Sequence, residues 1–229
     1  MRTLILIAAT LLLSAVLLPA QRDTALLNAD FVFADGVYLS LEQLRQNDPA
    51  YSWSEVEARL AANRDSYSAQ VEYIRPRAME PLPMEQVFAL VLDGLPYIQV
   101  TDPALQRAAA YFAGLRIRGR LCLYAYEFKE QREVEMAAYN PLTGRPFRRG
   151  VVTKEEEVLV RRLIHLETGE RGGFTRESLL QLMADDPKMQ RTVEELEDSG
   201  LEERMYKCIL IYDDRNPIYL PLLESDKKD

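Results

Sequence analysis

Up to residue 166, apolar residues occur in short runs that alternate with polar positions, and turn residues separate the runs. Residues 87–100 are the clearest example, with Asp93-Gly94 between two apolar runs. Because Asp-Gly suits a tight turn in which both central residues take positive φ, these residues are predicted to form a β-hairpin. Residues 31–39 share the pattern, with Asp35-Gly36 at the centre, and are predicted to form a shorter hairpin.

The segment from Leu115 to Phe128 alternates for much of its length, which predicts a strand with one apolar side. Residues 129–132 are then predicted as a polar turn, and residues 134–139 as the returning strand. Residues 140–150 contain two prolines and two glycines and are predicted as an exposed loop. A further strand is predicted over residues 157–166.

The apolar period changes after residue 170 and becomes helical. Thr175 is predicted to cap a helix that ends at Asp185-Asp186-Pro187, much as Ser40 and Gln43 form a capping box for a short helix earlier in the chain. Residues 188–199 are predicted to continue helically to Gly200, a C-terminal cap. The third helix carries one apolar stripe, formed by Leu201, Met205, Cys208, Ile209 and Tyr212.

Strands followed by helices predict an α+β fold. Its body is an antiparallel β-sheet of hairpins, arranged as a small sandwich or a curled sheet, and a C-terminal helical segment follows. The predicted division is a signal peptide over residues 1–20, a β-rich body over 21–170, a helical segment packed on the body over 171–217, and an extended, frayed tail over 218–229.

The first residues have the pattern of a secretory signal peptide. Arg2 precedes an uncharged apolar run from Leu4 to Leu18, and Pro19-Ala20 precedes polar sequence. A helix over that run would reach roughly 22 Å, short of the roughly 30 Å of a bilayer core. We therefore expect cleavage after Ala20 and a periplasmic or secreted protein with no membrane span after removal of the signal. An uncleaved membrane anchor is the alternative.

The net charge restricts the classes of partner, and the two cysteines raise the question of a disulfide. With 28 Lys and Arg against 36 Asp and Glu, the net charge is −8, which argues against nucleic acid and anionic membranes as partners. In an oxidising compartment Cys122 and Cys208 could form a disulfide. The other possibility is that both are buried thiols that pack as small apolar side chains.

The most specific candidate for binding is a row of arginines on the predicted strand over residues 115–128. Alternation would place Arg116, Arg118 and Arg120 on one face, roughly 6.6 Å apart. Tyr124 and Tyr126 continue that face and could stack on a ligand. Such a row suits an anionic glycan or an acidic partner segment. Alternatively, glutamates 133, 135 and 155–157 neutralise the arginines across the sheet.

Signatures of catalysis and of metal or cofactor binding are missing. His165 is the sole histidine, so sites with several histidine ligands are excluded, and its apolar neighbours favour a structural role over that of a general base. No GxSxG or phosphate-binding glycine motif occurs, although Gly169–Gly173 could form an anion nest. Asp213–Asn216 offers oxygen ligands without the pattern of a calcium loop. No catalytic residue, metal or cofactor is predicted.

Three segments of the chain carry a resemblance to known sequences. FVFADGVYLSLEQLRQNDP resembles the opening of secreted, uncharacterised proteins from Bacteroidota, which begin with a DG-[IV]-Y-L-[ST] pattern and soon reach N-x-P. LDGLPYIQV and HLETGERGGFTRESLLQLMADDP are similar to later segments of such proteins. The resemblance implies export and a β-rich body, and it implies no activity or functional residues.

These observations favour a non-enzymatic binding or accessory protein of the cell envelope, whose partner is an envelope protein or an anionic glycan. Two alternatives remain. One is a hydrolase that acts on saccharides with paired carboxylates, which 36 acidic residues permit. The other is a structural subunit of an envelope assembly, in which the stripe of Met205, Cys208 and Ile209 packs against a partner.

Overall fold

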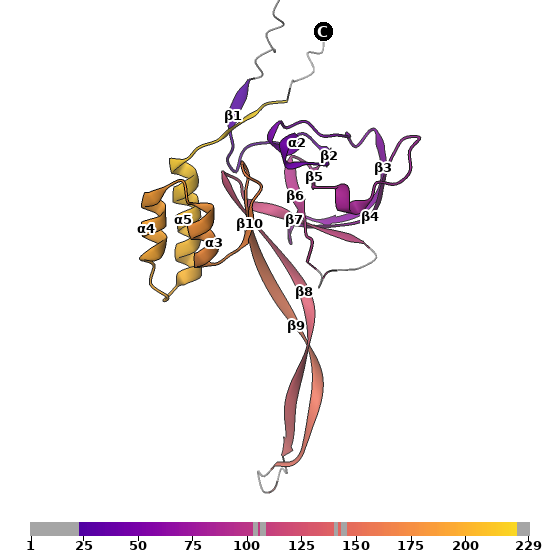
Figure 1. Ribbon diagram of the computed structural model, residues 1–229. Coiled ribbons are helices and arrows are strands. Elements are labelled where there is room, and N and C mark those ends of the chain that lie inside the picture. The colour runs from indigo at the N-terminus through magenta and orange to yellow at the C-terminus, as the bar shows by residue number, and fades with distance from the viewer. Residues whose placement is uncertain (1–22, 103–104, 106–108, 140–141, 143–145, 224–229) are drawn as a thin grey trace, which may run out of the picture.

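The computed structural model describes residues 23–102, 105, 109–139, 142 and 146–223 (Figure 1). The predicted leader, residues 1–20, lies outside this range. Antiparallel strands form a curled nine-stranded sheet, which confirms the predicted α+β fold. Its strands are β2 (Gly36–Tyr38), β3 (Val56–Asn63), β4 (Ser68–Pro76), β5 (Ala89–Leu92), β6 (Leu95–Gln99), β7 (Ala110–Ile117), β8 (Leu121–Tyr139), β9 (Pro146–His165) and β10 (Arg171–Gly173).

The sheet has the order β10-β9-β8-β7-β6-β5-β2 and branches at β7. The first half of β7 pairs with β4, which continues to β3, whereas residues 115–117 pair with β8. A second, two-stranded sheet joins the two ends of the described chain through β1 (Thr24–Leu26) and β11 (Tyr219–Pro221). Residues 219–221 of the predicted tail are thus paired strand.

The predicted hairpin over residues 87–100 is confirmed as β5 and β6. Asp93 and Gly94 take φ values of 51° and 74°, as a primed turn requires. The predicted hairpin over residues 31–39 is wrong, because β2 pairs with β5 instead. The carboxylate of Asp35 accepts a hydrogen bond from the amide of Gly94 at 2.8 Å, so Asp35-Gly36 anchors the neighbouring turn.

The strands β8 and β9 are the largest departure from the sequence prediction. They pair without interruption from Leu121↔His165 to Ala138↔Arg148, so residues 129–132 are strand and the predicted polar turn is wrong. Residues 146–150 of the predicted loop also belong to β9, while residues 140, 141 and 143–145 lie outside the described range. In Figure 1 the far half of this ribbon projects away from the rest of the molecule.

In the described part of the chain, four α-helices and a short 3-10 helix (Met84–Gln86) accompany the sheet. The α-helices are α2 (Leu41–Arg45), α3 (Arg176–Leu182), α4 (Pro187–Glu194) and α5 (Leu201–Arg215). Ser40 and Thr175 cap α2 and α3 with their side-chain oxygens, as predicted. Asp186 caps α4, with Pro187 in its first turn. Gly200 does not end a helix: it precedes α5 with a φ of 68°. No helix in the described part of the chain is long and apolar enough to cross a membrane.

The base of the β8–β9 ribbon is buried on both faces. One face carries Leu123 and Leu163, which pack against α3, α4 and α5. The other face carries Tyr124 and Ile164, which pack against the N-terminal segment and the neighbouring strands. The sheet therefore separates two apolar clusters, and a third fills the space around β3 and β4.

This layering bears on two alternatives that the sequence left open. Met205, Cys208 and Ile209 form the predicted helical stripe, but the stripe is buried against the protein's own sheet and is not available to a partner. Cys122 and Cys208 form no disulfide and are free, buried thiols. Cys122 belongs to the cluster on one face of the sheet and Cys208 to the cluster on the other, so the sheet itself separates them.

Candidate functional site

The predicted row of arginines is not continuous in the structure. A register shift between Leu115 and Ile117 leaves Arg116 at a bulge, and residues 118–120 form the connection from β7 to β8. Because a bulge and a turn both break the alternation of faces, the three arginines do not form one regular row. Glutamates 133, 135 and 155–157 lie on the far part of the ribbon and are not their partners.

Each arginine has its own environment. Arg116 is exposed, with its guanidinium carbon 5.3 Å from the centroid of the Tyr67 ring. Arg118 donates to the carbonyl oxygens of Phe31, at 2.9 Å, and Ala29, and burial lowers its pKa. Arg116 and Arg118 do line a common cavity of about 470 Å³. Arg120 points elsewhere and forms ion pairs with Glu167 and Asp185.

Arg120 is part of a polar network that ties the helices to the sheet. Its guanidinium lies 2.5 Å from Glu167 and 3.3 Å from Asp185. The hydroxyl of Tyr212 donates to Asp185 at 2.7 Å, and Nε2 of His165 lies 3.3 Å from the same hydroxyl oxygen. Because the amide of Thr168 donates to Nδ1, the proton of His165 resides on Nε2.

Burial lowers the pKa of His165, and the charge of Arg120 lowers it further, so the imidazole is neutral at pH 7. This histidine is 4% exposed and joins β9 to α5. Its hydrogen bonds are those of a structural side chain.

Asp213 holds the turn between β7 and β8. Its Oδ1 accepts the amide of Leu121 at 2.8 Å, and burial raises the pKa of the carboxyl to about 7. A Cβ at Gly119 would lie 2.2 Å from Oδ2, so glycine is required for this approach.

The oxygen ligands considered at residues 213–216 do not form a loop. Asp213 lies within α5, and Arg215 pairs with Asp186 at 2.8 Å. Among the described residues, no group of three or more potential metal ligands comes together.

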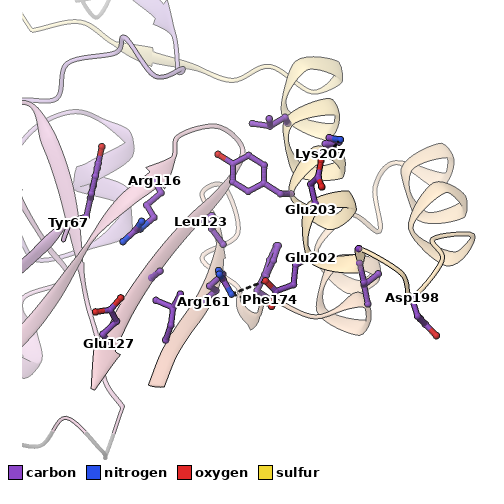
Figure 2. Close-up of a pocket in the computed structure, with 16 residues that line it drawn as sticks. Tyr67, Arg116, Leu123, Glu127, Arg161, Phe174, Asp198, Glu202, Glu203 and Lys207 are labelled. Atoms are coloured by element: carbon purple, nitrogen blue, oxygen red, sulfur yellow. Dashed lines mark hydrogen bonds and ion pairs between the residues drawn. The ribbon is translucent and has the colours of Figure 1, made fainter. Parts of the chain in front are cut away.

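A groove of about 1120 Å³ lies between α5 and the face of β8 and β9 that the helices cover. Figure 2 shows side chains from the strands and from α5 that face each other across it. Its apolar residues are Leu123, Ala125, Leu159, Phe174, Leu201, Tyr206 and Leu210. Its charged residues are Arg116, Glu127, Arg161, Asp198, Glu202, Glu203 and Lys207. We call this cavity the groove.

On the α5 side of the groove, the carboxylates of Glu202 and Glu203 both form ion pairs. Arg161 lies 3.2 Å from Glu202, and Lys207 lies 2.7 Å from Glu203. The bond to Lys207 lowers the pKa of Glu203, whereas a general acid needs a raised one. This pairing does not favour acid–base chemistry in the groove. An apolar floor with paired charges at its margin is typical of a surface that binds another molecule.

The ribbon beyond the groove, which we call the arm, consists of residues 129–139 and 146–157. It extends roughly 35 Å at the usual rise per residue. Residues 129–136 and 150–157 are all exposed, including apolar Met136 at 58% and Val151 at 63%. In the described structure, β7 pairs with β8 only up to Tyr124, and β10 pairs with β9 only from Arg162, so no strand covers either edge of the arm.

One side of the arm continues the strand face that forms the groove. Its directly opposed residues are Lys129 and Glu157, Gln131 and Glu155, Glu133 and Thr153, and Glu135 and Val151. We call this side the acidic face, because it has four glutamates and a lone lysine. On the other side, Glu130 lies directly opposite Glu156, and Arg132 opposite Lys154. Like charges in such positions destabilise a strand pair.

Tyr124 and Tyr126 lie on the opposite side of the sheet from the groove. They are only 4% and 3% exposed, so their rings are core and cannot stack on a ligand. Gly172 and Gly173 of the predicted anion nest belong to β10, an edge strand. The site therefore differs from the sequence prediction: it shares Arg116, and its ion pair between Arg161 and Glu202 forms only because α5 packs on β9.

Comparison with protein-family models, with curated proteins and with solved structures gives no match for this chain. Any assignment of function therefore rests on the groove, the arm and the physical chemistry of their residues.

Proposed function

We propose that the protein is a non-enzymatic binding or accessory protein of the cell envelope, and that the arm and the groove together bind a partner polypeptide. The observation that carries the proposal is the arm, a two-stranded ribbon with both faces in solvent. A two-stranded hairpin without a packed face is marginally stable in water. Unpaired strand edges and exposed apolar side chains are stabilised when a partner covers them.

The partner's chemistry follows from that of the arm. Four glutamates on the acidic face oppose one lysine, so a partner segment with lysines or arginines would gain opposite charges there. The same strand face leads to Leu159 and the apolar floor of the groove. We therefore propose a segment that is basic where it meets the arm and apolar where it enters the groove.

Location in the envelope is supported by the leader alone. If residues 1–20 are a signal peptide, mass spectrometry of the native protein will find an N-terminus at or near Gln21. Native protein that retains Met1 would contradict export by this route.

The binding surface is tested with a synthetic peptide of alternating lysine and leucine residues, followed by fluorescence anisotropy. The double variant Glu133→Lys, Glu135→Lys should bind it at least about tenfold more weakly, because attraction becomes repulsion at the acidic face. Affinity of the unaltered protein should also fall as salt rises. A peptide of alternating glutamate and leucine should not bind.

The matched control is Glu194→Lys with Glu195→Lys, which changes the net charge equally at exposed positions on and after α4. It should bind the basic peptide as the unaltered protein does. Equal losses in the two double variants would show attraction to net charge alone and would contradict a binding site on the arm. Failure of the unaltered protein to bind the basic peptide at low salt would also contradict a binding site on the arm.

A further inference from the structure

Another cavity, of about 440 Å³, lies on the face of β8 and β9 opposite the groove. Its lining includes Tyr124 and Tyr126 of β8, Arg162 of β9 and Arg171 of β10. The strand register explains this grouping, since Tyr124 lies directly opposite Arg162, and Arg162 directly opposite Gly173. The absence of a side chain at Gly173 leaves space beside the guanidinium of Arg162, whose Nη1 would lie 3.8 Å from a Cβ there.

Each guanidinium in this cavity contacts a tyrosine hydroxyl. Arg162 contacts Tyr126, and Arg171 contacts Tyr124. Both tyrosine rings are buried in the core, which fixes the positions of their hydroxyl groups. Burial also raises the pKa of Tyr124, so its hydroxyl keeps its proton and remains able to donate a hydrogen bond.

The two arginines differ in how their charge is compensated. Arg162 lies 3.9 Å from the carboxylate of Asp102, which also accepts the hydroxyl of Tyr126 at 2.7 Å. Arg171 donates to the carbonyl oxygen of Gln99 at 3.3 Å and lies 5.4 Å from the centroid of the Phe88 ring. No carboxylate of the described chain forms an ion pair with Arg171. The described lining residues thus carry two positive charges and one negative charge.

We infer that this cavity binds a small organic molecule through a carboxylate, which Arg171 receives in its planar fork of donors. A guanidinium binds a carboxylate with two parallel hydrogen bonds, a geometry that a tetrahedral anion does not share in full. The hydroxyl groups of Tyr124 and Tyr126 then meet polar groups on the rest of the ligand. The volume is near the lower end for small-molecule pockets, so it suits one sugar acid rather than a longer chain.

This inference is independent of the proposed function, because the cavity and the groove lie on opposite faces of the sheet. The test uses D-glucuronate, D-glucose and inorganic phosphate as probes in isothermal titration calorimetry. D-glucuronate should bind at least tenfold more tightly than either of the other two. Equal binding of D-glucose or phosphate, or no binding of D-glucuronate, would overturn the inference.

Two variants locate the site. Arg171→Gln should weaken glucuronate binding at least tenfold, and Tyr124→Phe should weaken it severalfold while keeping the buried ring. Arg75→Gln is the matched control, since Arg75 also lies over an aromatic ring, 5.7 Å from the centroid of Tyr73, but far along the sheet on β4. Glucuronate binding that survives Arg171→Gln, or falls equally in Arg75→Gln, would contradict this location.

Discussion

The base and the arm of the β8–β9 ribbon are the same two strands in one unbroken register, and they differ in what surrounds them. At the base, Leu163 is fully buried against the helices and Ile164 against the other apolar cluster. In the arm, side chains of the same strands are exposed on both sides. Strand pairing therefore continues through both regions, whereas packing against other elements is confined to the base.

The largest effect should come from removing packing at the base. Leu163→Ala deletes a buried side chain between β9 and the helices, and should lower the free energy of unfolding by about 2–5 kcal/mol. Val151→Ala removes an apolar side chain from the arm and should change the free energy of unfolding by less than about 0.5 kcal/mol. Urea denaturation measures both. Similar losses in the two variants would mean that the arm is packed as the base is.

The next effect concerns the turn at the base and depends on pH. The folded protein raises the pKa of Asp213 from 3.8 to about 7, so the folded state binds this proton more tightly than the unfolded state. The resulting stabilisation is complete below pH 3.8 and is lost as the pH rises through 7. Between pH 4.5 and 7.5 the loss amounts to about 3 kcal/mol.

Asp213→Asn tests this titration, because the amide oxygen can still accept the hydrogen bond from Leu121. The variant should be less sensitive to pH over that range than the unaltered protein, as measured by unfolding at each pH. If the difference in stability between the two proteins is the same at pH 4.5 and 7.5, Asp213 does not titrate as we expect.

The smallest effect is local to the arm. Glu130→Lys places opposite charges across from each other at Glu156 and should stabilise the ribbon by about 0.5 kcal/mol. Because the arm has no packed face, this gain should appear as slower hydrogen exchange of arm amides, with little change in global unfolding. Exchange that slows equally at the base would show that the two regions open together.

Local signals in the sequence were sufficient for several elements. Asp93-Gly94 predicted its hairpin, and Ser40 and Thr175 predicted their helix starts, because a turn or cap depends on a few neighbouring residues. The continuous strand through residues 129–132 was missed because strand prediction relies on one buried face, and the arm has none. A strand with polar residues on both faces gives the same run of polar positions in the sequence as a polar turn.

The candidate site was less predictable for a different reason. Gly119, inside an apparently alternating run, was the one signal that the arginine row is interrupted, since glycine in a strand often marks a bulge or a close approach. Arg161 and Glu202 are 41 positions apart and meet only through the packing of α5 on β9. No local pattern encodes such a contact.

The separation of the two thiols by the sheet has a consequence for the chemistry of the folded protein. Burial raises the pKa of Cys122 to about 12 and also raises that of Cys208, so neither side chain is a thiolate at neutral pH. Oxidants and alkylating reagents therefore reach sulfur only after the chain opens. Modification of Cys122 therefore reports exposure of the cluster on one face of the sheet, and modification of Cys208 reports exposure of the cluster on the other face.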